Sequence, residues 1–422
     1  MSTPRPALFR ALKHRNYRLF FAGQFVSLIG TWISSIATSW LAFRLTGSEL
    51  ILGVVGFCGQ FPTFLVAPVA GVLIDRWNRQ RVMIATQFSS MLQSFALAYL
   101  TLSGQIDIPI LCLLCVAQAI INAFDMPARQ SFVNEMIEDK LDLPNAIALN
   151  STMFNSGRLI GPAIGGIIIA ASNEGVCFLV DGVSFFAVLI SLFQIRLASG
   201  AAHVSKHNLV EGFVDGVTYV WRFVPIRELI KLVGLISLLG TPHFVLMPVF
   251  AREVLQGGPE RLGLLMGASG LGAVAGSLYL ASRRSIVGLG SLIVTAGFVH
   301  SLALIGFALS NRLWLSLVLI FFSGIAVIFL LASCNTLIQT LADPAKRARV
   351  MSLYTTAFMG MMPLGGLIAG ALASRIGAPN TVLAGGAACI GVAVMFWKKL
   401  PEIRRQARPV YEAQGIVPPK RG

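Results

Sequence analysis

Charged side chains are scarce in this chain: Asp, Glu, Lys and Arg make up only 12% of its 422 residues, whereas 55% of the residues are hydrophobic. A soluble domain carries about 25% charged residues, so the composition excludes a soluble protein and indicates one that crosses a membrane many times. Acidic residues are the scarcest, with 18 Asp and Glu against 33 Lys and Arg. The basic residues lie between hydrophobic runs, where membrane topology explains them, so we expect no nucleic-acid partner.

Motifs for catalysis and cofactor binding are missing as well. The sequence has no Walker loop, zinc-ligand spacing, nucleophile elbow or glycine-rich dinucleotide turn in the required context. Its six cysteines lie in or at the ends of apolar runs, and Cys112-x-x-Cys115 has no His or Cys partners nearby in the chain. We therefore expect neither an enzyme nor a bound cofactor or metal.

Long hydrophobic runs are abundant. Runs of about 20 residues, the length of a membrane-spanning helix, begin near Leu19, Ile51, Val82, Ile108, Ala146, Val176, Leu229, Leu262, Val287, Leu313, Val350 and Val382. The residues before the first run are basic and lack the features of a cleavable signal peptide, so this run is expected to stay in the protein. The sequence thus predicts an all-α membrane protein with twelve transmembrane helices.

The distribution of Lys and Arg predicts the orientation. These residues are frequent before the first run, in every second connecting segment and after the last run. The alternate segments hold only Arg44, Arg252, Arg261, Arg312 and Arg375. Short basic segments stay on the cytoplasmic side. We therefore expect a multi-pass protein of the inner (plasma) membrane with both termini in the cytoplasm.

The longest internal connector divides the runs into six plus six. We expect a cytoplasmic N-terminal segment at 1–17, a six-helix bundle at 18–196, a cytoplasmic connector at 197–228, a second six-helix bundle at 229–400 and a flexible cytoplasmic tail at 401–422. Within the connector, Leu209, Phe213, Val217 and Val220 recur at helical spacing beside Trp221. This pattern predicts an amphipathic helix on the inner membrane surface.

The loop between the second and third runs is short and strongly basic. Its sequence is Gly71-Val-Leu-Ile-Asp-Arg-Trp-Asn-Arg-Gln-Arg81. Asp75 follows the end of a helix, where its carboxylate could accept hydrogen bonds from unpaired N–H groups at the start of a neighbouring helix. Asp75 and Arg76 are therefore candidates for a conformational latch, and a solvated loop acid is the alternative.

A glycine-rich stretch occurs at the same place in each half. Gly157-Arg-Leu-Ile-Gly-Pro-Ala-Ile-Gly-Gly166 lies in the fifth run and Gly360-Met-Met-Pro-Leu-Gly-Gly366 in the eleventh, which predicts two pseudo-symmetric bundles. Gly157, Gly161 and Gly165 form a stripe on which another helix can pack closely, and Pro162 favours a bend. Plain helix packing is the alternative to a role in conformational change.

These stretches resemble motifs of the major facilitator superfamily. The loop resembles its Gly-x-Leu-x-Asp-Arg-x-Gly-Arg-Arg motif, with Asn78 in place of a Gly and Gln80 in place of a basic residue; Asn tolerates a left-handed turn. The glycine motif of the fifth run resembles that of the export branches. Further resemblance, to the bacterial subgroup that contains the enterobactin exporter, comes from segments 30–32, 39–41, 45–48, 125–130, 143–149 and 347–352.

Two departures from the family pattern bear on mechanism. The family often has an Arg in the fourth span, and the matching residue here is Gln118. The second copy of the loop motif, at 276–284, has no acid, so only the first copy can use a carboxylate as a latch.

Polar side chains form stripes on several runs. In the resembled fold the first, fourth, seventh and tenth spans line a central cavity, which makes these stripes candidate substrate contacts; buried interhelical hydrogen bonds are the alternative. The candidates are Gln24, Thr31, Gln118, Asn122, Asp125, Asn155, Arg158, Asn335 and Gln339.

Asp125 is the candidate proton-coupling residue, because it is the one carboxylate on a polar stripe of a presumed cavity helix. Arg158 lies at a similar depth on the next run, and we expect the two side chains to pair. Asp181 lies nearer the outer surface and is a poorer partner for Arg158. His243 and His300 are the only histidines within runs, and each is a further titratable group or a structural residue.

These observations predict a secondary active transporter that exports an amphipathic small molecule, a drug-like compound or a siderophore-like metabolite, by proton antiport with alternating access. Small-molecule substrate, protons and membrane lipids are the expected partners, and a monomer is expected. A lipid or lysophospholipid flippase of the same fold and a non-transporting sensor or scaffold are the alternatives.

Overall fold

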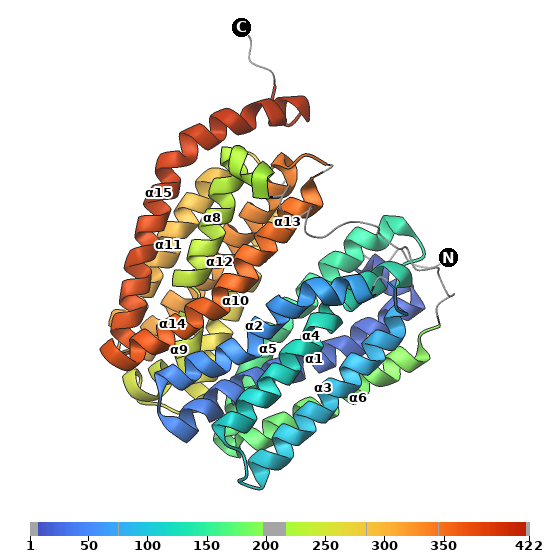
Figure 1. Ribbon diagram of the computed structural model, residues 1–422, viewed down its shortest axis with the longest axis vertical. Coiled ribbons are helices and arrows are strands. Elements are labelled where there is room, and N and C mark those ends of the chain that lie inside the picture. Colours follow the sequence, from blue (N-terminus) through green and yellow to red (C-terminus); the bar gives the residue numbers. More distant parts are fainter. Residues whose placement is uncertain (1–6, 75, 197–216, 284, 345, 419–422) are drawn as a thin grey trace. The chain divides into compact units, whose positions relative to one another are not determined.

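The computed structural model describes residues 7–74, 76–196, 217–283, 285–344 and 346–418, and nearly all of them lie in helices (Figure 1). Within these ranges there is no β-strand. The prediction of an all-α protein is confirmed.

Six long helices make up the first half of the chain. A 3₁₀ segment, η1 (Ala7–Lys13), precedes them, and η2 (Lys140–Asp142) precedes the fifth. The helices are α1 (Arg15–Thr46), α2 (Glu49–Ile74), α3 (Arg79–Leu102), α4 (Ile108–Met136), α5 (Leu143–Ala171) and α6 (Glu174–Gln194). Local sequence fixes several ends: Gly47 terminates α1 in the left-handed conformation, and Asp107 accepts a hydrogen bond from the Ile110 N–H at the start of α4.

The second half contains more interruptions. Its described elements are α8 (Val224–Leu239), α9 (His243–Val249), the π-helical η3 (Phe250–Val254), α10 (Pro259–Ser282), α11 (Leu289–Leu309), α12 (Leu313–Leu341), α13 (Arg347–Thr355), the π-helical η4 (Thr356–Gly360), α14 (Met361–Ile376) and α15 (Ala378–Ala413). The breaks at 240–242 and at η4 fall inside predicted runs, so α8 with α9 and α13 with α14 each correspond to one run.

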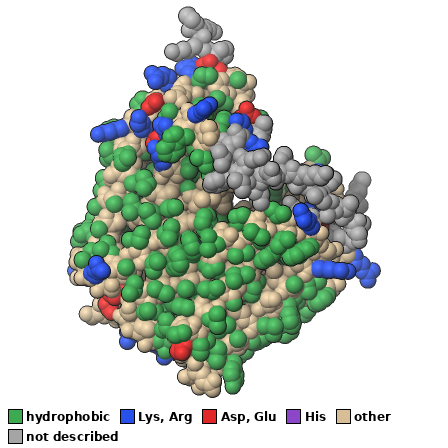
Figure 2. All heavy atoms as spheres, viewed as in Figure 1, with side chains coloured by type: hydrophobic (Ala, Val, Ile, Leu, Met, Phe, Trp, Pro, Cys, Tyr) green, Lys and Arg blue, Asp and Glu red, His purple; other side chains and the backbone are tan. Residues whose placement is uncertain are grey.

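Each of the twelve predicted runs coincides with a helix or a pair of consecutive helices. Eleven helical segments among the described residues are long and apolar enough to cross a membrane. The remaining run, α3, is 24 residues long but more polar, because its buried face carries Thr86, Gln87, Ser90 and Ser94. Hydrophobic side chains are spread over much of the face in Figure 2, as contact with lipid requires.

The C-terminal helix extends beyond the predicted boundary. α15 continues through Pro401 and Pro409 to Ala413, so the expected flexible tail at 401–422 is wrong for residues 401–413. Ile403 and Ala407 are buried in the hydrophobic core of the second half, which explains why the helix persists despite its basic residues. The predicted amphipathic helix of the connector begins outside the described residues.

The chain forms two compact units. Unit one comprises Met1–Ser205 and Met247–Gly270, and unit two comprises Lys206–Leu246 and Leu271–Gly422. In unit one, α1 packs on α5 and α6, α2 packs on α4, and α3 packs on α4 and α6. In unit two, α11 packs between α12 and α15, and α8 packs on α14 and α15.

Candidate functional site: a polar network inside unit one

The glycine stripe of α5 is a packing surface for α1. A side chain at Gly161 would place its Cβ 2.4 Å from the Cβ of Trp32, and one at Gly165 would lie 2.5 Å from Ile36. At Gly157 the nearest atoms are those of Leu28 and Trp32 on α1, at 3.1 Å. Only glycine permits this approach of the two helices. Pro162 is buried within α5, which continues through it.

The start of α3, after the loop from α2, is fixed to the end of α6. Asp75, the predicted latch acid, lies outside the described residues, and Arg76 is exposed. Asn78 tolerates a left-handed conformation but adopts an extended one here. Its side chain accepts a hydrogen bond from the Arg81 N–H and caps α3. Gln80 donates to the carbonyl oxygens of Leu192 and Ile195 at 2.7 and 3.0 Å, at the end of α6. The two departures from the family motif therefore each supply a helix-terminus contact.

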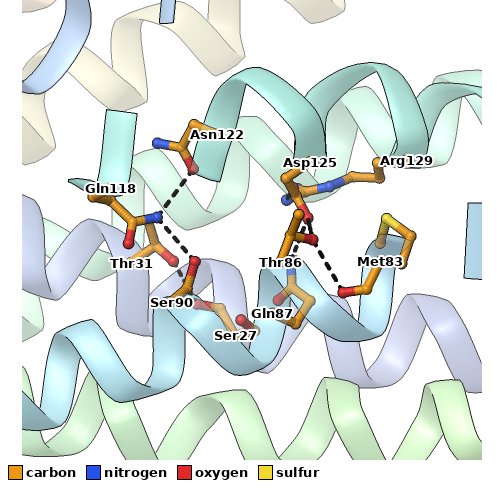
Figure 3. A network of polar contacts seen from close by, with 10 residues as sticks. All are labelled: Ser27, Thr31, Met83, Thr86, Gln87, Ser90, Gln118, Asn122, Asp125 and Arg129. Atoms are coloured by element: carbon orange, nitrogen blue, oxygen red, sulfur yellow. Dashed lines mark hydrogen bonds and ion pairs between the residues drawn. The ribbon is translucent and has the colours of Figure 1, made fainter. Parts of the chain in front are cut away.

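Asp125 lies at the centre of a polar network between α3 and α4 (Figure 3). Asp125 is 2% exposed. One carboxylate oxygen accepts hydrogen bonds from Thr86 at 3.0 Å and Gln87 at 2.6 Å, and the other forms an ion pair with Arg129. A buried carboxylate requires such partners, because an isolated charge in a low-dielectric interior is very costly.

Arg129, rather than Arg158, is the partner of Asp125. The predicted pairing with Arg158 on α5 is therefore wrong, although Arg158 is half-buried there. Arg129 lies four residues after Asp125 on α4, so the pair forms within one helix face. Its Nε has no hydrogen-bond partner among the described residues, which leaves a donor for water or a ligand.

The other candidates of unit one divide into two groups. Gln118 donates to Ser90 of α3 at 3.0 Å and to Asn122 at 3.1 Å, which forms a second polar group between the same two helices, two turns of α4 from Asp125 (Figure 3). Thr31 and Asn155 bond instead to carbonyl oxygens of their own helices. Gln24 is 2% exposed, and its amide oxygen has no partner among the described residues.

The sequence interpretation missed α3 as a source of site residues. Thr86, Gln87 and Ser90 hold the α4 side chains, and Ser94 donates to Asp181 of α6 at 2.8 Å. Gln87, Ser90 and Ser94 recur at i, i+3 and i+7, the same helical spacing that drew attention to α1 and α4. That spacing could have identified this face.

In unit two, Gln339 donates to Asn335 at 2.6 Å, one turn away on α12. Gln339 also lines a cavity of about 640 Å³ together with Thr340, Arg347 and Gln414. The pair is thus polar and accessible at one end of α12.

A bundle of membrane-length helices with buried polar networks, and with a repeated glycine packing motif, is the architecture of a membrane transporter. The family model described as transmembrane secretion effector, of the major facilitator superfamily, matches residues 7–415, and this chain belongs to that family.

Its curated relatives include exporters. The chain is 26% identical to the staphyloferrin A transporter of Staphylococcus aureus over 388 residues, covering 90% of this chain and 95% of the relative. It is 26% identical to the multidrug efflux pump Tap of Mycolicibacterium fortuitum over 391 residues, with the same coverage. It is 21% identical to macrolide efflux protein A of Streptococcus pyogenes, covering 91% and 96%. The protein is an efflux-type transporter of this superfamily and not an enzyme.

Solved structures agree on the fold. A bacterial homologue of the human lysosomal transporter Spinster matches with a TM-score of 0.67 at 14% identity, over 96% of this chain and 99% of that chain. A peptide transporter matches with a TM-score of 0.74 at 12% identity, over 93% and 95%. At these identities the likeness concerns the fold alone.

Proposed function

We propose that this transporter exports an amphipathic small molecule from a bacterial cytoplasm in exchange for protons, with Asp125 as the residue that carries the coupled proton. The observation that supports this most directly is the buried Asp125–Arg129 pair with its neutral donors Thr86 and Gln87. The relatives named as multidrug and macrolide efflux proteins support an organic substrate that is moved outward.

The network offers two arrangements of similar energy. With Asp125 ionised, its charge is matched by Arg129 and by two hydrogen bonds. With Asp125 protonated, the carboxyl remains bonded to Gln87 while the guanidinium is released. Arg129, whose side chain is 27% exposed, can then bind water. A cationic or hydrogen-bond-donating group of the substrate would compete with the proton for the ionised Asp125 carboxylate, so the binding of one would exclude the other, as antiport requires.

The cavity candidates fit an amphipathic substrate. Gln118 and Asn122 offer amide groups next to the ion pair, Gln24 and Thr31 lie on α1, and Asn335 with Gln339 provides amides on α12. Arg158 and Asn155 on α5 complete the proposed set. Few polar groups on largely apolar helices favour a ligand that is mostly hydrophobic.

Substrate-dependent proton movement in proteoliposomes tests the proposal. Vesicles containing a pH-sensitive dye and a preset pH gradient receive either a macrolide or staphyloferrin A, the compounds named for two relatives. We expect at least one compound to dissipate the gradient with the wild-type protein and not with D125N. Export that accumulates either compound equally well without a pH gradient would contradict proton coupling.

We propose that the protein lies in the inner membrane with both termini in the cytoplasm, because the basic segments favour that orientation. A reporter fused after Arg81, Lys206 or Arg404 should be cytoplasmic, and one after Gly104, Gly258 or Asn311 should be outside. The opposite alternation would overturn this topology. Asp75 and Arg76 remain the proposed latch, and D75N is expected to change the accessibility of cysteines introduced into the cavity.

A further inference from the structure

Two histidines that lie 57 positions apart in the sequence come together inside unit two. His243 begins α9 and His300 lies in α11, and the centroids of their rings are 6.0 Å apart. They are 3% and 0% exposed. Neither residue belongs to the polar network of unit one.

Hydrogen bonds define which nitrogen of each ring can take a proton. The Nδ1 of His243 lies 2.6 Å from the carbonyl oxygen of Gly240. A carbonyl oxygen only accepts hydrogen bonds, so Nδ1 carries the proton of the neutral ring and Nε2 is its basic nitrogen. The Nδ1 of His300 lies 3.0 Å from the Ser323 hydroxyl on α12, and its Nε2 has no hydrogen-bond partner among the described residues.

Gly240 makes room for this arrangement. A Cβ at this position would lie 2.6 Å from Nε2 of His300 and 3.1 Å from Sγ of Cys389. Gly240 and His243 also line a cavity of about 240 Å³ whose other walls are mostly apolar. The cavity therefore places an open volume beside His243.

Few other ionisable groups surround the pair. Cys389 of α15 is the titratable neighbour beside Gly240. α11 and α12 contain no Asp, Glu, Lys or Arg, and the only other titratable side chain in them is Cys334. In α8 the charged residues lie in the first two turns. The charged residue of α14 is the exposed Arg375 at its end, and in α15 the charged residues begin at Lys398. No described carboxylate of these helices is placed to hold a second positive charge on the pair.

We propose that His243 and His300 together form a proton-binding site in unit two that accepts a single proton. Two imidazolium rings at this distance would repel each other strongly in a buried site, so the first proton prevents the second. A metal is not the favoured ligand, because no group of three or more His, Cys, Asp or Glu among the described residues is arranged to hold one. The site extends the proposed proton coupling, on which it rests, to the second half of the transporter.

Proton counting on the purified protein tests the site without a substrate. Wild type and H243N/H300N in detergent are titrated potentiometrically from pH 8.5 to 5.0, and the protons bound are compared. Asn can place an amide N–H near the position of Nδ1 and removes the basic nitrogen. We expect the double variant to bind one proton fewer. Equal counts would show two permanently neutral structural rings, and a deficit of two would show independent histidines; either result overturns the proposal.

Single variants keep the test valid if the double variant does not fold. In H243N or H300N the remaining ring still takes a proton, so the count should match wild type while the midpoint shifts. A full proton lost in one single variant and none in the other would assign the proton to one histidine and overturn the shared site. S323A retains both rings and should retain the count.

This outcome is separable from that of the proposed antiport. The expected deficit together with export that ignores the pH gradient would leave the proton site standing and reject proton coupling. Equal counts together with proton-driven export would reject only the histidine site.

Discussion

The interiors of the two halves differ in chemistry although they share a packing motif. Unit one buries four carboxylates, those of Asp125, Asp142, Glu174 and Asp181, and two of them, Asp125 and Asp181, are bonded to side chains of α3. The core of unit two is built from aliphatic and aromatic residues, and its buried polar side chains are histidines and small hydroxyl residues. The two halves therefore share close helix packing at glycines but differ in the carboxylates that they bury.

Both halves have a glycine that lies directly against a neighbouring helix. Gly161 of α5 lies against α1, and Gly365 of α14 lies against α8, where an added Cβ would be 2.3 Å from the carbonyl oxygen of Leu238. The two halves are therefore comparable in packing. If a polar substitution in one half changes transport more than one in the other half, the difference reports on function.

The largest expected effect is loss of coupled export in D125N, by more than an order of magnitude. Asn cannot alternate between a charged and a neutral form, and it leaves Arg129 without its counter-ion. Removing one partner of a buried pair costs about 3–5 kcal/mol, and less here because Arg129 is 27% exposed. Gradient-driven transport and thermal unfolding in detergent measure the loss of coupling and the loss of stability.

D125E, which keeps a titratable group, is the matched control and should recover part of the transport. Normal pH-driven accumulation by D125N would move the coupling site elsewhere.

The next effect concerns packing in both halves. G161A and G365A should each destabilise the protein by about 1–3 kcal/mol, the usual range for overpacking. Both would place a Cβ within 2.4 Å of atoms on the facing helix. G71A and G391A, also within helices, meet nothing within 4 Å and serve as controls in the respective halves. Thermal unfolding distinguishes them, and equal stability of all four variants would show that the close approach is not required.

These comparisons also show what the sequence could predict. Helix number and the glycine stripe follow from local patterns, hydropathy and i, i+4 spacing, and the structure agrees with both. The partner of Asp125 was missed because depth alone favoured Arg158, whereas Arg129 had the right spacing on the same helix. The His243–His300 contact depends on how α9 and α11 pack, which no local pattern reveals. The end of α15 was misjudged because Ile403 and Ala407 gain burial that outweighs the basic composition.

A smaller effect is expected at the second buried acid. Asp181 accepts a hydrogen bond from Ser94, but no ion pair forms at Asp181 among the described residues. D181N should retain coupled export, since no cation is released there, and should stabilise the fold because a buried carboxylate without a counter-ion is costly. The same transport and unfolding assays apply. Loss of coupling in D181N with retention in D125N would reverse the roles assigned to the two acids.

The smallest effect is expected at an acid outside the membrane-spanning segments. Asp142 in η2 binds Lys13 at 2.6 Å and His14 at 3.1 Å, which ties η1 to the start of α5. The hydrogen bond from Lys13 lowers the pKa of Asp142 below its usual 3.8, and the same bond raises the pKa of Lys13.

The pH dependence follows from the signs of these shifts. A lowered acid pKa adds stability that is fully present above the usual value of 3.8 and is lost as the pH falls through the lower value of the folded state. A raised Lys13 pKa adds stability that is lost only above pH 10.5.

D142N should therefore unfold a few degrees below wild type from about pH 5 to pH 9, and this difference in unfolding temperature should disappear in acid. D139N is the matched control, because Asp139 is half-exposed and 3.8 Å from Lys13. A gap that persists unchanged at pH 3 would show that Asp142 acts through packing of η2 and not through its charge.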